Sequence, residues 1–340
     1  MAAIVETERR RHGCRILIIG CGQLGSRHLQ AIACLPEVSE IEIVDPRPEA
    51  LELGSARLAE VDDRLASTKT YRWLSSIEDA TPKGHLCIVA TQARGRGQIV
   101  RQVAEVLGYT AFLLEKIVAQ STGEYETLMT FAAEKRLSVW VNCKTRAYPF
   151  HQYVKGRLDP AEPITFSVVG GNHGLANNGV HAADLFVFYD GSQTFAQAGD
   201  RIDPILHPSK RGNEVFDLSG TLLGGTARGS HFTISYAGDH ANSEQITIAT
   251  PSYRCIVDHM QRWAVESDAA TGWAYRPVAF EGNLMVSEMT KRFASDILAR
   301  GRCLLPTLEE AFLGHRFILD VLQPHFSRLL ERKVERCPVT

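Results

Sequence analysis

Short apolar runs alternate with segments of helical spacing through the first half of the chain. Strands are predicted at CRILIIG (14–20), SEIEIVD (39–45), HLCIVAT (85–91), TAFLLEK (110–116) and LSVWVNC (137–143). Between them, apolar residues recur at three- and four-residue spacing, which is typical of helices. Because strands separated by single helices form βαβ units, this half predicts a parallel sheet.

In the second half of the chain the regular alternation stops. A short strand is predicted at 164–171 and a buried helix at 179–191, and glycine-separated β-rich runs fill residues 194–266. Two helical segments, 283–301 and 307–330, close the chain. Runs of strands after a βα domain predict a separate α+β domain on a large, mostly antiparallel sheet.

These patterns divide the chain into three parts. Residues 1–13 contain three arginines and no apolar core of a signal peptide, so they are expected to form a disordered tail. An α/β domain with a doubly wound parallel sheet, a Rossmann domain, is predicted for 14–145, and the α+β domain for 146–340. Helices should cover one face of the second sheet. A partner subunit should cover the other, which predicts a homodimer or homotetramer through this C-terminal sheet.

The composition excludes several classes of protein. The formal net charge is −2 and acids and bases are interspersed, so no basic face indicates nucleic-acid binding. No apolar run approaches the length of a membrane span. The eight cysteines form no CxxC pair and have no zinc-ligand spacing, so no metal site is predicted. Their positions in apolar runs favour the reducing cytoplasm.

The segment GCGQLG (20–25) is a GxGxxG motif that ends a strand and opens a helix. With an acidic residue, Asp45, at the end of the next strand, this context is the dinucleotide-binding fingerprint. Asp45 is expected to bind the adenosine ribose, which favours NAD, whereas the nearby Arg47 would suit the 2′-phosphate of NADP. The motif predicts a cofactor site formed by Gly20, Cys21, Gly22, Gln23, Leu24, Gly25, Asp45 and Arg47.

Four motifs, in this order, resemble those of the glucose–fructose oxidoreductase / inositol dehydrogenase / MocA (Gfo/Idh/MocA) family. They are GCGQLGSRH, CIVATQARGRG, LLEKIVA and GGNHGLANNGVHAADLF, and they span most of the chain. The resemblance implies a Rossmann domain, a substrate-binding and oligomerising α+β domain, and NAD(P)-dependent oxidation or reduction of a sugar or cyclitol carbon. It also implies that Thr91 and Glu115 contact the cofactor, although Glu115 is expected to orient backbone or pair with Lys116.

The resemblance assigns proton transfer to Lys116 and His181. A partly desolvated lysine has a lowered pKa, which suits proton exchange near neutrality. The structural alternatives are a solvated strand end for Lys116 and a satisfied core histidine for His181. Asp184, on the same helix face as His181, would either orient the imidazole or be a solvated acid.

Further residues of the second half are candidates for substrate contacts. Asn177 stands where the family has aspartate, and its amide can bind a substrate hydroxyl without accepting its proton. Asn178 occupies a favoured N-cap position. Arg146 is expected to contact substrate or to serve a structural role between domains, and Asn172 is a weaker candidate. The clusters around His207 and Arg211, and around Arg254 and His259, have no motif and are expected to be surface.

Ile117 stands where the family has a proline after the lysine, and this departure raises two questions. A cis bond before a residue other than proline costs about 3 kcal/mol, so the Lys116–Ile117 bond is expected to be trans. The leading interpretation is a sugar dehydrogenase or reductase that serves polysaccharide or sugar-derivative biosynthesis. Because the motif proline and aspartate are absent, two alternatives stay open. One alternative is a non-catalytic NAD(H) sensor, and the other is an enzyme that retains NAD and performs no net redox reaction.

Overall fold

The computed structural model describes residues 13–62, 64–209, 212, 214–279 and 284–340. Residues 1–12 of the expected disordered tail, and Arg211, lie outside the described residues. The chain divides into two compact units. Unit 1 comprises the described parts of Met1–Ala119, Glu124–Asn142 and Asn283–Leu308, and unit 2 those of Gln120–Gly123, Cys143–Gly282 and Glu309–Thr340.

Unit 1 is built on a six-stranded parallel sheet with the order β3-β2-β1-β4-β5-β6. Five of its strands were predicted, and the sixth, β3, was not. The segment TYRWL of β3 lies at the edge of the sheet and is only partly buried, so it lacks the long apolar run of the others. The strands are β1 (Cys14–Ile19), β2 (Val38–Val44), β3 (Thr70–Leu74), β4 (Leu86–Val89), β5 (Ala111–Leu114) and β6 (Ser138–Val141).

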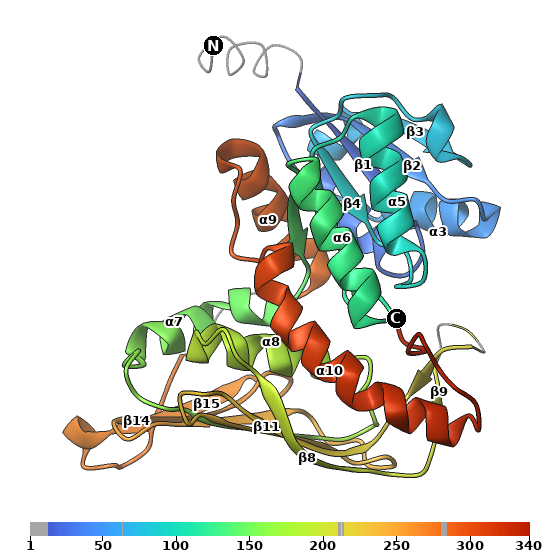
Figure 1. Cartoon of the computed structure of the whole chain (residues 1–340). Coiled ribbons are helices and arrows are strands. Elements are labelled where there is room, and N and C mark those ends of the chain that lie inside the picture. The colour runs from blue at the N-terminus through green and yellow to red at the C-terminus, as the bar shows by residue number, and fades with distance from the viewer. Residues whose placement is uncertain (1–12, 63, 210–211, 213, 280–283) are drawn as a thin grey trace. The chain divides into compact units, whose positions relative to one another are not determined.

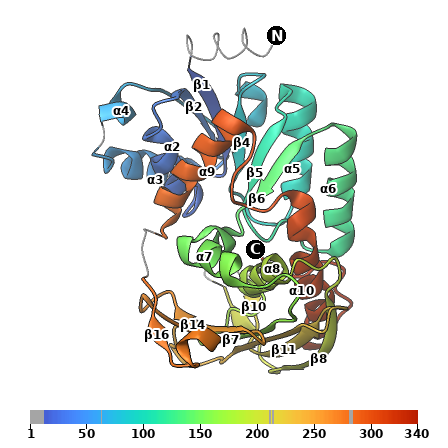
Figure 2. The same cartoon turned by 90° about the vertical axis from the view of Figure 1, so that its left-hand side faces the viewer.

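Helices cover both faces of this sheet, with α2, α3 and α9 on one face and α5 and α6 on the other (Figure 2). The sequence analysis assigned α9 to the C-terminal domain, whereas its contacts place it in unit 1, where it packs on α2. It does so because Met289, Phe293 and Ile297 are buried along one side of the helix. The helices are α2 (Gly25–Ala33), α3 (Pro48–Ala59), α4 (Arg64–Ser67), α5 (Arg96–Gln102), α6 (Thr122–Glu134) and α9 (Val286–Arg300), with single turns η1 (Ile77–Asp79) and η2 (Val103–Leu107).

Unit 2 is built on an eight-stranded sheet with the order β16-β15-β14-β13-β7-β12-β11-β8. Every pairing is antiparallel except that of β7 with β12, which confirms the predicted mostly antiparallel sheet. The strands are β7 (Thr165–Gly170), β8 (Ala196–Ile202), β11 (Gly220–Gly225), β12 (His231–Tyr236), β13 (Gln245–Ala249), β14 (Tyr253–Asp258), β15 (Trp263–Asp268) and β16 (Arg276–Pro277), and β9 (His207–Pro208) pairs separately with β10 (Phe216–Asp217).

The helices α8 (Gly179–Asp190) and α10 (Leu308–Leu329) pack on one face of the unit 2 sheet (Figure 1). An aromatic cluster fills the contact, and the Phe317 ring of α10 stacks on Phe195 with a centroid distance of 4.0 Å. Val169 and Leu223 are 53% and 41% exposed on strands β7 and β11. The remaining helical elements of unit 2 are α7 (Pro149–Arg157), η3 (Lys144–Ala147) and η4 (Ala269–Thr271).

A search of the described helices finds none that is both long enough and apolar enough to cross a membrane.

Candidate functional site

The glycine loop that joins β1 to α2 has the backbone geometry that its sequence requires. Gly20 has a φ of +87°, a conformation in which a side chain is disfavoured. A Cβ atom placed on Gly25 would lie 1.7 Å from the Gly20 carbonyl oxygen, so only glycine allows the helix to start this close to the strand. Gly22 is more open, since an added Cβ would contact only the Arg47 guanidinium, at 3.6 Å. The loop therefore leaves room for a ligand to approach the backbone at Gly22.

Asp45 follows β2 and lies beside this loop. The side chain is 2% exposed, and its Oδ2 accepts a hydrogen bond of 2.8 Å from the backbone N–H of Cys21. Arg47 donates to both carboxylate oxygens, at 3.1 and 3.0 Å. Burial by itself raises the pKa of Asp45, but the hydrogen bonds from Arg47 and Cys21 outweigh it and lower the pKa. Sequence reasoning treated Asp45 and Arg47 as competing determinants, whereas the structure makes them an ion pair.

The carboxyl ends of β1, β2, β4, β5 and β6 share one edge of the sheet because all the strands are parallel. Strand order reverses between β1 and β4, and such switch points are where open α/β sheets bind ligands. Thr91 lies just after β4, and its Oγ1 is buried without a hydrogen-bond partner among the described residues. Glu115 and Lys116 come directly after β5, and both are buried. The predicted cofactor residues thus gather at this edge.

Glu115 is held by side chains rather than by backbone. Its Oε1 is 2.8 Å from His28 Nε2 and accepts a hydrogen bond of 2.6 Å from Asn142 Nδ2. The carboxyl is 4% exposed, and burial alone would raise its pKa, but the contacts with His28, Asn142 and Lys116 lower it to about 2. Glu115 is therefore a carboxylate at neutral pH. Sequence reasoning noticed His28 only as a trailing motif residue and missed Asn142.

The Lys116–Ile117 peptide bond is cis, so the prediction of a trans bond was wrong. That prediction considered only the intrinsic cost of the isomer and not the contacts around the bond. The buried Arg96 guanidinium donates a hydrogen bond of 2.6 Å to the carbonyl oxygen of Glu115, and it also donates to the carbonyl oxygens of Ile117 and Thr91. The backbone is therefore anchored on both sides of Lys116 by a residue that sequence reasoning missed.

In unit 2, His181 lies in the first turn of α8 and is half-buried. Its backbone N–H donates to the carbonyl oxygen of Asn178, at 2.9 Å. Asn178 occupies the predicted N-cap position, but its exposed side chain makes no capping hydrogen bond to the described backbone of α8. The capping role predicted for this side chain is therefore wrong, although the helix begins where expected.

The asparagines before α8 have different surroundings. Asn177 is 9% exposed, and its side-chain amide forms hydrogen bonds with backbone groups. Its Nδ2 donates to the carbonyl oxygen of Phe216 at 3.0 Å, and its Oδ1 accepts from the N–H of Thr340 at 3.0 Å. Asn172 is exposed and has a φ of +59°. Asn177 thus ties the loop to the strand β10 and to residue 340, while Asn172 presents its side chain outward.

Arg146 and Asp184 form a buried ion pair inside unit 2. The Arg146 Nε and Nη2 donate to the two carboxylate oxygens of Asp184 at 2.8 and 2.6 Å, and the residues are 6% and 1% exposed. Glu310 lies 3.7 Å from Arg146 Nη1. The expectation of a solvated Asp184 is therefore wrong, because both of its oxygens are occupied by a buried guanidinium. For Arg146, this geometry favours a structural role within unit 2. Its expected roles as a substrate contact and between domains stay predictions.

Histidines outside the predicted site are also paired. The Nε2 atoms of His151 and His259 are 2.6 Å apart, and His151 Nδ1 is 2.5 Å from the Tyr189 hydroxyl. Burial lowers the pKa of His259 to about 4. The surface position expected for His259 is therefore wrong, because the residue is half-buried and its imidazole packs against His151. His207 Nε2 lies 3.0 Å from Ser219 Oγ, and the His207 ring is 4.6 Å from that of His173.

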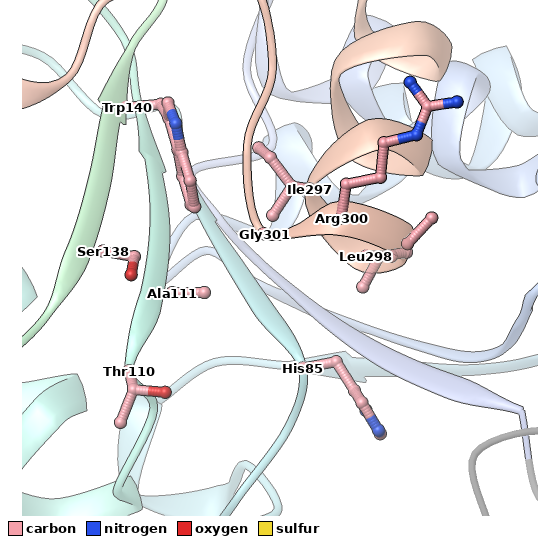
Figure 3. A pocket seen from close by; sticks show the side chains of 10 residues that line it. His85, Thr110, Ala111, Ser138, Trp140, Ile297, Leu298, Arg300 and Gly301 are labelled. Atoms are coloured by element: carbon pink, nitrogen blue, oxygen red, sulfur yellow. The ribbon is translucent and has the colours of Figure 1, made fainter. Parts of the chain in front are cut away.

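A groove of about 300 Å³ lies at the opposite edge of the unit 1 sheet, at the amino ends of β4, β5 and β6. Figure 3 shows the Trp140 indole turned into it and the Arg300 guanidinium pointing away. Because the glycine loop and Lys116 lie at the carboxyl edge, this groove is not the predicted cofactor site. Among the described residues, no His, Cys, Asp and Glu cluster is arranged to hold a metal ion.

Comparison with known proteins identifies this fold. UDP-N-acetylglucosamine 3-dehydrogenase GnnA from Acidithiobacillus ferrooxidans is similar with a TM-score of 0.67 and 16% identity, over 95% of this chain and 98% of that one. A Gfo/Idh/MocA family oxidoreductase from Vibrio cholerae gives 0.68 and 15%, over 94% and 100%. Levoglucosan dehydrogenase in complex with NADH and levoglucosan gives 0.72 and 15%, over 94% and 98%. No family model matches the sequence, and no curated protein matches it.

Proposed function

We propose that this protein is an NAD(P)-dependent oxidoreductase that transfers a hydride to or from a carbon of a sugar, a cyclitol or a sugar derivative. One observation carries the proposal. The glycine loop, Asp45 and Lys116 share the carboxyl edge of one parallel sheet, around its switch point. Structures with the same fold include proteins described as levoglucosan dehydrogenase in complex with NADH and as UDP-N-acetylglucosamine 3-dehydrogenase.

The residues at this edge fit a dinucleotide. The N-terminus of α2 and the open backbone at Gly22 suit a pyrophosphate, and the buried Thr91 hydroxyl suits a polar ligand group. A bound nicotinamide would supply or accept the hydride. NAD(H) is proposed as the preferred cofactor because the Asp45 carboxylate lies beside the glycine loop, where it can accept hydrogen bonds from a ribose. Arg47 forms an ion pair with this carboxylate and neutralises its charge, so the preference for NAD(H) over NADP(H) is expected to be modest.

Lys116 and His181 are proposed as the groups that move the substrate hydroxyl proton. Hydride transfer at an alcohol carbon needs such a partner, and lysine and histidine are both competent. Lys116 is 6% exposed, which suits a group used away from bulk water. His181 is half-buried at the start of α8, where its ring can exchange a proton.

The proposed substrate is a small sugar-like molecule, and the pathway is the biosynthesis of a polysaccharide or a sugar derivative. Asn172 and Asn178, with exposed side chains, are proposed to contact it. Arg146, Asn177 and Asp184 are proposed to act indirectly, because their polar groups already hold the surrounding backbone and one another.

The exposed outer face of the unit 2 sheet is proposed to bind a second copy of the chain, giving a dimer or tetramer. Val169 and Leu223 lie on this face and would be removed from water in such an assembly. A cytoplasmic location is also proposed, because buried cysteines suit a reducing compartment and no disulfide joins the eight cysteines, all of which are described.

Lys116→Met tests the proposed function. Wild-type protein is assayed with NAD(H) and NADP(H) against a panel of sugars, nucleotide sugars and cyclitols, following the absorbance of the reduced nicotinamide. The variant is expected to bind NAD(H) within about threefold of wild type and to lose turnover by about a hundredfold or more, because only proton transfer is removed. His181→Ala should lose less. Unchanged turnover in Lys116→Met would refute the assignment, and NAD(H) binding without any turnover by wild type would favour the sensor.

A further inference from the structure

The carboxylate of Glu115 connects elements that are far apart in the sequence. Glu115 directly follows β5, Asn142 directly follows β6, and His28 lies on α2, which begins at the glycine loop. One oxygen atom, Oε1, contacts both His28 Nε2 and Asn142 Nδ2. On its other side, His28 Nδ1 is 2.9 Å from the hydroxyl of Thr290 on α9. Three elements of unit 1 therefore meet at this carboxylate, and His28 connects it to a fourth, α9.

The protonation of these groups follows from their contacts. A carboxylate only accepts hydrogen bonds, so His28 Nε2 must carry the hydrogen that points to Glu115. Both residues are almost fully buried, at 0% and 4% exposure, so each would be costly to bury alone. Each group compensates for the burial of the other only when the imidazole is turned so that its Nε2–H points to Glu115. The cluster is therefore rigid at its centre.

Lys116 is the next residue after this carboxylate. Arg96 anchors the backbone carbonyl oxygens of Glu115 and Ile117, which lie on either side of the lysine. With the preceding side chain held by His28 and Asn142, the Cα of Lys116 is fixed from three directions. Only the lysine side-chain torsions remain to set the position of its ammonium group.

We propose that His28 and Glu115 are positioning residues for Lys116, through which the helix that begins at the glycine loop sets the place and the charge environment of the reacting ammonium group. The inference rests on the proposed function, because it requires Lys116 to be the group that exchanges the proton. His28 orients Glu115, and the Glu115 carboxylate supplies a fixed negative charge next to the lysine.

The Glu115→Gln variant tests the charge. Its amide keeps the size of the side chain but removes the negative charge that favours the ammonium form of Lys116. We expect the midpoint of the pH profile for the proton acceptor to move about one unit lower, and KM for NAD(H) to stay within about threefold. The plateau kcat above that midpoint should fall about threefold, because a weaker base accepts the substrate proton less readily. A residue that merely stabilises the fold would leave that midpoint in place.

Glu42→Gln is the matched control in the same unit. Glu42 is also a fully buried carboxylate, and it holds Arg72 and the backbone and hydroxyl of Thr81. The same substitution there removes an equally buried charge at a site outside the Lys116 environment. It is expected to lower the thermal stability and to leave the pH midpoint unchanged. A shift of equal size in both variants would overturn the proposal.

Two substitutions of His28 separate its two contacts. In His28→Gln, the amide nitrogen takes the place of Nε2 and can still donate to Glu115. In His28→Asn, the shorter amide takes the place of Nδ1, towards Thr290. We expect the Gln variant to keep kcat within about threefold of wild type and the Asn variant to lose about tenfold. Equal activity in the two variants would show that orientation of Glu115 is not the role of His28.

The wild type and Lys116→Met together distinguish failure of this inference from failure of the proposed function. If the wild type shows no turnover on the substrate panel, the proposed function fails, whatever the other variants show. If the wild type is active and Lys116→Met retains that turnover, the function stands but the proton-transfer role of Lys116 fails, and the positioning role fails with it. If Lys116→Met is inactive but Glu115→Gln keeps wild-type kcat and pH midpoint, the function stands and the positioning role is refuted. Binding of NADH, measured by the fluorescence of the reduced nicotinamide, serves in every variant as evidence that unit 1 is folded.

Discussion

Replacing Arg146 with methionine decides whether this residue contacts the substrate or stabilises unit 2. The substitution removes the guanidinium but keeps an unbranched apolar chain of similar length. Asp184, at 1% exposure, would then be a buried carboxylate that has lost both of its hydrogen bonds to Arg146. Breaking a buried ion pair on one side typically costs about 3–5 kcal/mol, and we expect a loss in this range at neutral pH.

The stability of Arg146→Met relative to wild type is expected to change with pH in one direction. Burial already raises the folded-state pKa of Asp184 above its unfolded value in the wild type, and Arg146 opposes that rise, so removing Arg146 raises the pKa further. The folded state then binds a proton more tightly than the unfolded state, so the variant loses stability as pH rises through the folded-state pKa. The deficit relative to wild type should therefore be smallest below the unfolded pKa of about 3.9 and largest at neutral pH.

Urea unfolding followed by circular dichroism, at several pH values, measures the deficit. Arg157→Met is the matched control, because Arg157 also pairs with a carboxylate, Asp268, at 2.6 Å but is 37% exposed. Loss of that partly exposed pair should cost about 1 kcal/mol or less. In the double variant Arg146→Met with Asp184→Leu, most of the lost stability should return, because no uncompensated charge remains buried.

A different outcome would refute this reasoning. If the free energy of unfolding of Arg146→Met falls by less than about 1 kcal/mol while the KM for substrate rises sharply, Arg146 is a substrate contact and the ion pair contributes little to stability. A deficit that does not change with pH would likewise show that Asp184 is not the group left uncompensated.

Two further predictions concern the cofactor and the assembly. Arg47→Ala should weaken NADP(H) binding by about tenfold or more in calorimetry and leave NAD(H) within about threefold, because it exposes the Asp45 carboxylate to the 2′-phosphate; a parallel loss for both cofactors would contradict the ribose assignment. Val169→Lys places a charge on the exposed face of the unit 2 sheet and should convert the oligomer to a folded monomer in light scattering, whereas an unchanged mass, or a monomeric wild type, would exclude this interface.

Local patterns in the sequence were enough for much of the fold. Five of the six parallel strands and the helix α8 follow from apolar runs, helical spacing and glycines, because these signals lie within short windows. The edge strand β3 was not predicted, because apolar and polar residues alternate only weakly from Thr70 onward and the strand is only partly buried. The position of α9 was not predicted either. The apolar side of this helix indicates that it packs on something, but not that the surface is α2.

The sequence indicated candidate residues of the site but not the partners of those residues. Asp45 and Lys116 were candidates because motifs place them at strand ends, and the structure has them there. The partners of Glu115 and Asp184 could not be predicted, because His28 and Arg146 are distant in the sequence and carry no spacing that links them. Buried polar side chains must find partners, but the sequence does not say which ones.

The packing of α9 on α2 has a consequence for the order of events during synthesis. Unit 1 begins near the amino terminus, yet its helix Val286–Arg300 and the hydroxyl of Thr290 emerge from the ribosome only after most of unit 2. At translation rates of roughly 5–20 residues per second, the nascent sheet waits on the order of ten seconds for this helix. During that interval the surface of α2 that α9 will bury is open, and it is the place where a chaperone would be expected to bind the growing chain.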